Sequence, residues 1–299
     1  MHDIIVIGAG PAGLTAALYA LRGGKSVLVL EKGTFGGQVT YSPKIENYPG
    51  FVQMSGAEFA DKLVEQVLNQ GADIEMETVT GLEKQDGAFT VSTDCGEHKA
   101  KAVIIAVGVH HRRLGLDGEE ELIGKGIGFC AVCDGAFYAD GTVAVIGGGN
   151  SALQEALLLS ETCRKVYVVQ NLDFLTGEGK LVEAVNAKDN IELICGATVD
   201  SLVAEDVLKG IILNVNGEKQ ELMLDGMFIA IGLIPKNEMF ESITALKDGY
   251  IDANEGCVTD TAGVFVAGDC RTKTVRQITT ATADGATAAL AACRYLDGR

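Results

Sequence analysis

Residues 4–13 read I-I-V-I-G-A-G-P-A-G and lead into the alanine-rich stretch L-T-A-A-L-Y-A-L-R. The apolar run predicts a buried strand, and Gly8, Gly10 and Gly13 have the spacing of the turn that carries a dinucleotide-binding unit into its first helix. The next strand, S-V-L-V-L-E, ends at Glu31, where an acidic side chain accepts hydrogen bonds from a ribose. This pattern favours a nucleotide-binding unit over a purely structural glycine turn.

The same pattern recurs later in the chain at a fixed offset. The strand T-V-A-V-I leads into G-G-G-N-S-A, a helical stretch follows, and K-V-Y-V-V-Q ends at Gln170. In this alignment Gly8 corresponds to Gly147 and Glu31 to Gln170. Two strand–turn–helix–strand units in register predict two dinucleotide-type folds.

Each unit later returns an apolar strand that ends in glycine, at residues 103–108 and 227–232. A last strand at 263–269 precedes an Ala/Thr-rich helix near the C-terminus. This order predicts an α/β protein of two Rossmann-like, three-layer nucleotide-binding domains, the second inserted into the first. The expected boundaries are 1–113 and 242–299 for the first domain and 114–241 for the inserted domain.

Composition excludes several classes of protein. The 299 residues are 47% apolar and 22% charged, which is ordinary for a folded chain with a core. The net charge of −17 repels nucleic acid and anionic lipid, so we expect neither as a partner. No apolar run approaches the ~18 to 20 residues that span a bilayer, and the N-terminus shows no export signal. We therefore expect a cytoplasmic protein without a membrane segment.

Two of the eight cysteines, Cys130 and Cys133, form a C-x-x-C pair. This pair is a redox dithiol, half of a metal site or a coincidence, and the redox interpretation is favoured because no second cluster has the spacing of metal ligands. We therefore expect no metal. Asp134 either exchanges a proton with the thiols or is a turn residue before a glycine. We expect the remaining cysteines to be small buried residues: Cys95, Cys163, Cys195, Cys257, Cys270 and Cys293.

The second glycine turn differs from the first at its ribose position. Gln170 stands there, residues 170–179 contain no cation, and Asp173 and Glu178 would repel a phosphate. An NADP site usually carries arginine for the 2′-phosphate. We therefore expect NADPH to be an unlikely cofactor, whereas weak NADH binding through Gln170 stays open.

Several further motifs match a known family in order and spacing. They are G-G-Q (36–38), E-N-Y-P-G (46–50), C-A-V-C-D (130–134), A-G-D (267–269) and R-Q-I (276–278), together with the two glycine turns. Along essentially its whole length the chain resembles the low-molecular-weight thioredoxin reductases. The resemblance implies FAD in the first domain, the redox disulfide in the inserted domain, thioredoxin as substrate and a homodimer.

The resemblance also assigns roles to individual residues. Cys133 would face the flavin, Cys130 would attack thioredoxin, and Asp134 would handle the proton. The residues implied for FAD binding are Gly8, Gly10, Pro11, Ala12, Glu31, Lys32, Gly36, Gly37, Gln38, Asn47, Val79, Ala106, Gly108, Asp269, Arg276, Gln277 and Ile278.

One segment departs from the NADPH-dependent members of that family. They carry a basic H-R-R-x-x-x-R segment where this chain reads Q-N-L-D-F-L-T, residues 170–176. In this respect the chain resembles the ferredoxin-dependent flavin thioredoxin reductases. We therefore expect reduced ferredoxin to supply electrons through FAD to Cys130–Cys133. The alternatives are an NADH- or NADPH-dependent reductase with an altered nucleotide site, an oxidase or peroxide-reductase flavoprotein, and a non-catalytic redox module.

Overall fold

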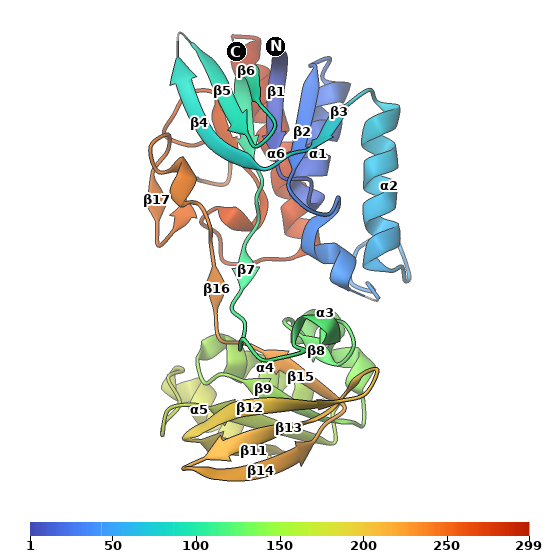
Figure 1. Ribbon diagram of the computed structural model, residues 1–299, viewed down its shortest axis with the longest axis vertical. Helices are drawn as coiled ribbons and strands as arrows, with labels where there is room; N and C mark the ends of the chain where they lie inside the picture. The colour runs from blue at the N-terminus through green and yellow to red at the C-terminus, as the bar shows by residue number, and fades with distance from the viewer. Residues whose placement is uncertain (43, 86, 299) are drawn as a thin grey trace. The chain divides into compact units, whose positions relative to one another are not determined.

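The computed structural model describes residues 1–42, 44–85 and 87–298, and its chain forms two compact units (Figure 1). Unit 1 comprises Met1–His110 and Ile234–Arg299, and unit 2 comprises His111–Leu233. The units thus divide after His110 and after Leu233, whereas the predicted boundaries fall after residues 113 and 241. Asn237 and Phe240, both fully buried, lie within unit 1: the Asn237 amide donates to the carbonyls of Gly249 and Cys270, and Phe240 packs in an apolar core of this unit.

The sheet of unit 1 is built around parallel strands in the order β3-β2-β1-β6, and β19 pairs in parallel with the end of β6. Ile4 and Val6 of β1 face one core, whereas Ile5 and Ile7 face another. Because both faces are buried, the strand reads as a continuous apolar run. The strands are β1 (His2–Ile7), β2 (Val27–Glu31), β3 (Asp73–Met76), β4 (Val79–Gln85), β5 (Ala88–Thr93), β6 (Glu97–Ile105), β17 (Leu246–Lys247), β18 (Tyr250–Ile251) and β19 (Val264–Val266).

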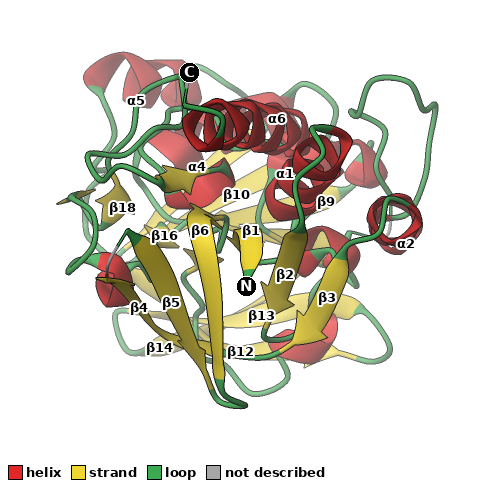
Figure 2. Cartoon of the chain, turned by 90° about the horizontal axis from the view of Figure 1, so that it is seen from above, coloured by secondary structure: helices red, strands yellow, loops and turns green. Residues whose placement is uncertain are grey.

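Helices cover one face of this sheet and the antiparallel strands β4 and β5 contribute to the other core (Figure 2). The helices are α1 (Pro11–Arg22), α2 (Gly56–Asn69) and α6 (Ile278–Leu296), with the short 3-10 helices η1 (Gly37–Tyr41), η4 (Glu238–Phe240) and η5 (Gly268–Cys270). A Cβ at Gly285 of α6 would lie 2.2 Å from the Ala12 carbonyl oxygen of α1. The small residues of both helices therefore permit their close packing.

Unit 2 repeats this arrangement. Its parallel sheet has the order β11-β10-β9-β15-β8, with α4 packed on one face and the antiparallel sheet β12-β13-β14 on the other. This confirms the predicted fold class. The strands are β8 (Ile127–Gly128), β9 (Thr142–Ile146), β10 (Lys165–Gln170), β11 (Ile191–Cys195), β12 (Ala197–Ala204), β13 (Leu208–Val215), β14 (Glu218–Met223) and β15 (Gly226–Ile229). The helices are α3 (Ala131–Asp134), α4 (Asn150–Ser160) and α5 (Gly179–Asn186), with η2 (Glu120–Leu122) and η3 (Gly135–Tyr138).

The two crossings of the chain, β7 (His110–His111) and β16 (Leu233–Ile234), pair with each other as a two-stranded ladder. Within the described ranges, no helix combines the length and the apolar character that crossing a membrane requires.

Candidate functional site

Cys130 and Cys133 are joined by a disulfide at the start of α3, with their Cα atoms 5.3 Å apart. Cys130 is the N-cap residue, and its sulfur accepts a hydrogen bond from the Cys133 N–H at 3.2 Å. Ala131 is buried in the core of unit 2, whereas Val132 is 61% exposed. The single helical turn thus anchors the disulfide on one side and presents its other side to solvent.

Asp134 ends α3 directly after the disulfide, and the ring of Tyr138 follows in η3. Burial, together with the charge of Asp134, raises the pKa of the Tyr138 hydroxyl to about 12. The side chain of Asp134 is half-buried and directly follows the sulfur pair, which is a position from which it can exchange a proton with a thiol.

An aromatic side chain missed by the sequence analysis precedes the disulfide. Phe129 stacks on His111 with ring centroids 4.7 Å apart, and the Arg113 guanidinium carbon lies 4.5 Å from the Phe129 ring centroid. Arg113 is exposed, so it combines this cation–π contact with a free path to solvent. The sequence contains the signal, because aromatic and basic residues flank C-x-x-C, but only the fold brings His111 and Arg113 onto Phe129.

In unit 1 the first glycine turn requires glycine at two positions. Gly8 has a φ of +104°, and a Cβ there would lie 2.5 Å from the Ala106 carbonyl oxygen. A Cβ at Gly13 would lie 1.8 Å from the Gly8 carbonyl oxygen. Gly10 is the N-cap of α1 and has open space around its Cβ position, with Gly36 O as the nearest atom at 4.0 Å. The turn thus brings α1 close to the sheet while leaving its N-terminus approachable.

The acidic side chain predicted for the ribose lies at the same edge. Glu31 ends β2, and its carboxylate accepts hydrogen bonds from Ala9 N–H at 2.8 Å and from Gly33 N–H at 2.9 Å. Gly36 N–H donates to the Ala9 carbonyl at 2.8 Å, which places the G-G-Q segment against the first turn. The Gln38 amide donates to the Val109 carbonyl, just after the end of β6.

The C-terminal motifs meet this edge as well. Asp269 follows β19; its Oδ1 is buried and has no hydrogen-bond partner among the residues that the structure describes. Burial raises the pKa of this carboxyl. Arg276 donates to the Asp269 carbonyl at 3.3 Å and lies 4.3 Å from the Tyr250 ring centroid. The Asn47 amide donates to the Gln277 side-chain oxygen at 3.4 Å.

The other residues assigned to the cofactor flank these elements. Pro11 and Ala12 begin α1, Lys32 follows β2, Gly37 begins η1, Val79 begins β4, Ala106 and Gly108 follow β6, and Ile278 begins α6. The parallel strands β1, β2, β6 and β19 all end at this edge. The carboxyl edge of a parallel sheet is where open α/β sheets bind ligands.

A buried ionic cluster behind this edge was missed by the sequence analysis. The Asp284 carboxylate of α6 accepts hydrogen bonds from Arg271, from Lys273 at 2.8 Å and from the Gly268 N–H at 3.1 Å. Burial acts to raise the pKa of Asp284, but the bonds from both cations outweigh it and hold that pKa below its ordinary value. The cluster ties α6 to the turn that carries Asp269.

The second glycine turn is filled by its own chain. A Cβ on Gly148 would lie 2.6 Å from Gln170 Nε2, and Gln170 is only 6% exposed. Thr176 N–H and Gly177 N–H both donate to the Gly148 carbonyl, at 2.8 and 3.0 Å. The segment after β10 therefore folds back onto the turn, and it brings no cation with it.

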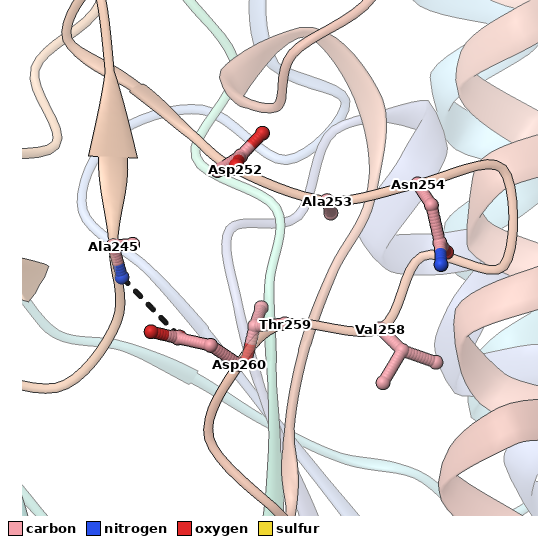
Figure 3. A pocket seen from close by; sticks show the side chains of 7 residues that line it. All are labelled: Ala245, Asp252, Ala253, Asn254, Val258, Thr259 and Asp260. Carbon is pink, nitrogen blue, oxygen red and sulfur yellow. Dashed lines mark hydrogen bonds between the residues drawn. The ribbon is translucent and has the colours of Figure 1, made fainter.

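A pocket of about 420 Å³ in unit 1 is lined by other residues (Figure 3): Ala245, Asp252, Ala253, Asn254, Val258, Thr259 and Asp260. Asp260 accepts hydrogen bonds from the Thr244 hydroxyl at 2.8 Å and from Ala245 N–H at 3.3 Å. Its carboxylate thus fixes the local loop, and none of the residues predicted from sequence lines the pocket.

The prediction that the scattered cysteines are buried holds for Cys163, Cys257, Cys270 and Cys293. It was wrong for Cys95, which is exposed, and for Cys195, which is half-buried. Cys95 lies in the turn between β5 and β6, where the chain faces solvent.

Comparisons with known proteins identify the family of the chain. The family described as Pyridine nucleotide-disulphide oxidoreductase matches residues 2–285. The chain is 40% identical to a 34.2 kDa protein in the rubredoxin operon of Clostridium pasteurianum, over 99% of this chain and 98% of that protein. It is 38% identical to the thioredoxin reductase of Treponema pallidum, over 99% of this chain and 97% of that one. The crystal structure of thioredoxin reductase from Streptococcus pyogenes has a TM-score of 0.95 at 36% identity, covering 100% of this chain and 99% of that one.

Two Rossmann-like units, one of which carries a C-x-x-C disulfide, define a disulfide oxidoreductase. The chain belongs to the pyridine nucleotide-disulphide oxidoreductase family, and the resemblance to thioredoxin reductases drawn from its motifs is confirmed at that level. The names of these relatives state no electron donor, so they do not support the ferredoxin-dependent subtype.

Proposed function

We propose that this protein is an FAD-dependent reductase that reduces the disulfide of thioredoxin through Cys130 and Cys133. The observation that carries the proposal is the Cys130–Cys133 disulfide, held at an exposed helical turn in a chain that also contains a complete glycine-turn site. Relatives named thioredoxin reductase that match nearly the whole chain support this substrate.

FAD fits the residues of unit 1. The N-terminus of α1, reached over Gly10, can approach a pyrophosphate, and Glu31 stands at the end of β2 for the ribose. The buried Asp269 Oδ1 without a partner among the described residues indicates a hydrogen-bonding group that the chain itself does not provide. FAD, when bound, supplies the conversion between one-electron and two-electron chemistry.

The sulfur chemistry follows from the places of the two cysteines. In the reduced enzyme the Cys130 thiolate attacks one sulfur of the thioredoxin disulfide, that S–S bond breaks, and a mixed disulfide forms. Cys133 then attacks Cys130, which releases reduced thioredoxin and restores the Cys130–Cys133 bond. Asp134 takes up and returns the proton that the thiols exchange. Val132, within the C-x-x-C turn, and Arg113, on the ring of Phe129 next to Cys130, offer an apolar and a cationic contact for the partner protein.

For the electron donor we propose an iron–sulfur protein of the ferredoxin type. The supporting observation is the turn of unit 2, where Gln170 covers Gly148 and where residues 170–179 contain no cation for a 2′-phosphate. Each lost charge-assisted hydrogen bond to phosphate costs about 1.5 to 3 kcal/mol. NADPH is the second candidate, because relatives such as those of Treponema pallidum and Bacillus subtilis carry the name thioredoxin reductase without a stated subtype. We also propose a cytoplasmic homodimer.

Donor and substrate are tested together in an anaerobic assay. The purified enzyme is mixed in turn with reduced ferredoxin, NADPH and NADH, and the reduction of thioredoxin is followed by thiol titration. We expect turnover with ferredoxin and a rate at least about 100-fold lower with NADPH, from the loss of two contacts to its 2′-phosphate. NADH lacks that phosphate, so we expect at most weak turnover with it through Gln170. Equal turnover with NADPH would refute the donor, and no turnover of thioredoxin with any donor would refute the substrate.

A further inference from the structure

A second carboxyl lies beneath the redox disulfide, and neither the motifs nor the proposed sulfur chemistry uses it. Glu155 is on α4, one helical turn from Ala152 on one side and from Leu159 on the other, and those two residues are buried. Positions separated by three and four residues share one face of a helix. Glu155 therefore belongs to the inward face of α4, although its residue type is that of a solvated surface.

The inward face of α4 is where the disulfide helix packs. Ala131 of α3 belongs to the same apolar cluster as Ala152 and Leu159. A Cβ at Gly135, directly after α3, would lie 3.0 Å from Leu159 Cδ2. The C-x-x-C turn thus rests on the part of α4 that carries Glu155.

The polar contacts of Glu155 point to this turn. The Ala131 N–H, the first amide after Cys130, acts as a hydrogen-bond donor to the Glu155 carboxyl. The other oxygen, Oε2, is buried and finds no hydrogen-bond partner within residues 1–42, 44–85 and 87–298. A buried carboxylate oxygen without a donor is costly when charged, whereas a protonated carboxyl is tolerated.

Asp134 is the charged group that faces Glu155 from α3. Burial, and in addition the charge of Asp134, raises the pKa of Glu155 to about 7. Tyr138 of η3 lies beside Asp134 and stays neutral. Leu181 and Val182 of α5 pack on the apolar cluster that contains Ala131, Ala152 and Leu159. The charged residues of α5, Lys180 and Glu183, are exposed to solvent.

We propose that Glu155 is a positioning residue for the redox disulfide. Glu155 shares one proton with Asp134 and thereby keeps a single negative charge beside the two thiols. The inference rests on the proposed role of Asp134 as the acid–base group. Two close carboxyls resist ionising together, so they titrate as a pair. While the two carboxyls of Glu155 and Asp134 together hold one proton, Asp134 can exchange a proton with a thiol. Once the two carboxyls have lost that proton, both are charged, and the added negative charge disfavours formation of the thiolate.

The experiment follows thiolate reactivity without any electron donor or thioredoxin. The full-length protein is reduced with dithiothreitol, the reductant is removed under anaerobic conditions, and the rate of iodoacetamide alkylation of Cys130 is measured from pH 5.5 to 9. We expect the alkylation rate of the wild type to rise with pH as the thiol ionises. Near pH 7 the profile should also show an inflection, above which the rate is lower than the curve for a single titrating thiol.

Three variants separate this role from a purely structural one. Glu155→Gln keeps an acceptor for Ala131 N–H, and Glu155→Met fills the same space without oxygen. Both are expected to remove the inflection and to raise the rate at pH 8 severalfold, up to about tenfold, since one pKa unit of like-charge interaction changes the thiolate fraction tenfold. Glu161→Gln removes an exposed charge at the C-terminal end of the same helix and should leave the inflection in place.

A wild-type profile without the inflection would overturn the proposal, and this outcome needs no variant to fold. An inflection that persists in both Glu155 variants, or that Glu161→Gln also removes, would overturn it as well. Because no electron donor and no thioredoxin enter the assay, failure here leaves the proposed enzyme activity intact. Likewise, an enzyme that fails to reduce thioredoxin leaves this measurement valid.

Discussion

Arg271 and Asp284 form a buried, two-pronged ion pair: the guanidinium donates from Nε at 2.9 Å and from Nη2 at 2.8 Å to the two carboxylate oxygens. The arginine follows the Asp269 turn and the aspartate lies inside α6. The pair therefore couples the turn at the end of β19 to the helix that packs on α1. Its loss affects the geometry of the proposed cofactor site as well as stability.

We predict that Asp284→Asn lowers the free energy of unfolding by about 3 kcal/mol, because it leaves Arg271 and Lys273 buried without their carboxylate. Urea denaturation at pH 7 measures the loss. Asp200→Asn is the matched control: it removes an exposed partner of Lys219 and should cost less than ~1 kcal/mol. The pKa of Asp284 is lower in the folded protein than in the unfolded one. Its ionic contribution to stability is therefore present above the unfolded pKa of 3.8 and is lost as the pH falls from there through the lower folded pKa. Equal losses in the two variants would contradict the prediction.

The two glycines at the start of α1 should respond differently to the same substitution. Gly13→Ala places a Cβ 1.8 Å from a carbonyl oxygen, so we predict a poorly folded protein. Gly10→Ala has space for its Cβ and a φ of −74°, so the fold should survive, whereas the approach of a pyrophosphate is blocked. Circular dichroism and the ratio of flavin absorbance to protein absorbance separate the two effects. A yellow, fully loaded Gly10→Ala protein would remove this turn from the cofactor site.

Single cysteine variants should divide the two sulfur roles. Cys133→Ser leaves Cys130 free to attack but without a resolving thiol, so a stable mixed disulfide with thioredoxin should accumulate. Cys130→Ser should form little of this adduct, and both variants should lose at least about 1000-fold in turnover, as removal of a nucleophile does. Non-reducing electrophoresis detects the adduct. An adduct formed by Cys130→Ser rather than by Cys133→Ser would reverse the assignment.

The raised pKa of Glu155 also predicts a pH dependence of stability. The folded value of about 7 exceeds the unfolded 4.5, so this group stabilises the fold fully below pH 4.5 and the contribution is lost as the pH rises through 7. The difference corresponds to a loss on the order of 3 kcal/mol in the wild type. Glu155→Gln should show a flatter curve between pH 5 and 8, measured by urea denaturation at each pH. Parallel curves for the two proteins would show that Glu155 titrates normally.

A cation at the second glycine turn should improve the use of NADPH. Asn171 is exposed and directly follows Gln170, so Asn171→Arg adds a donor for a 2′-phosphate without disturbing the core. We predict that flavin bleaching by NADPH accelerates about tenfold and that salt reduces the gain. Asn171→Gln, of neutral charge, is the control. An unchanged rate would mean that the missing cation does not limit NADPH.

Most of the fold was predictable from local pattern. The continuous apolar strands before Gly8 and Gly147, and the glycines themselves, identify both parallel units because a strand buried on both faces has no polar alternation. The boundary near residue 241 was not predictable, because burial of Asn237 depends on carbonyls of Gly249 and Cys270, which are distant in sequence.

The candidate site divides in the same way. Cys130, Cys133 and the glycine turns are recognisable because their chemistry depends on short spacings. Glu155, Tyr250 and Asp284 are ordinary residues in sequence: a glutamate in a helical stretch, a tyrosine near a turn and an aspartate in an Ala-rich helix. Their surroundings come from elements far along the chain, and no local pattern encodes them.

The amino-acid sequence by itself determined the two nucleotide-type units, the disulfide pair and the absence of cations after Gln170, because each depends on residues within one strand–turn–helix segment. Only the tertiary structure decided that Asp284 neutralises two buried cations and that Glu155 lies beneath the C-x-x-C turn. The physical reason is that burial and electrostatic environment are set by packing between distant segments. The protonation of a side chain follows from that environment rather than from its neighbours in the chain.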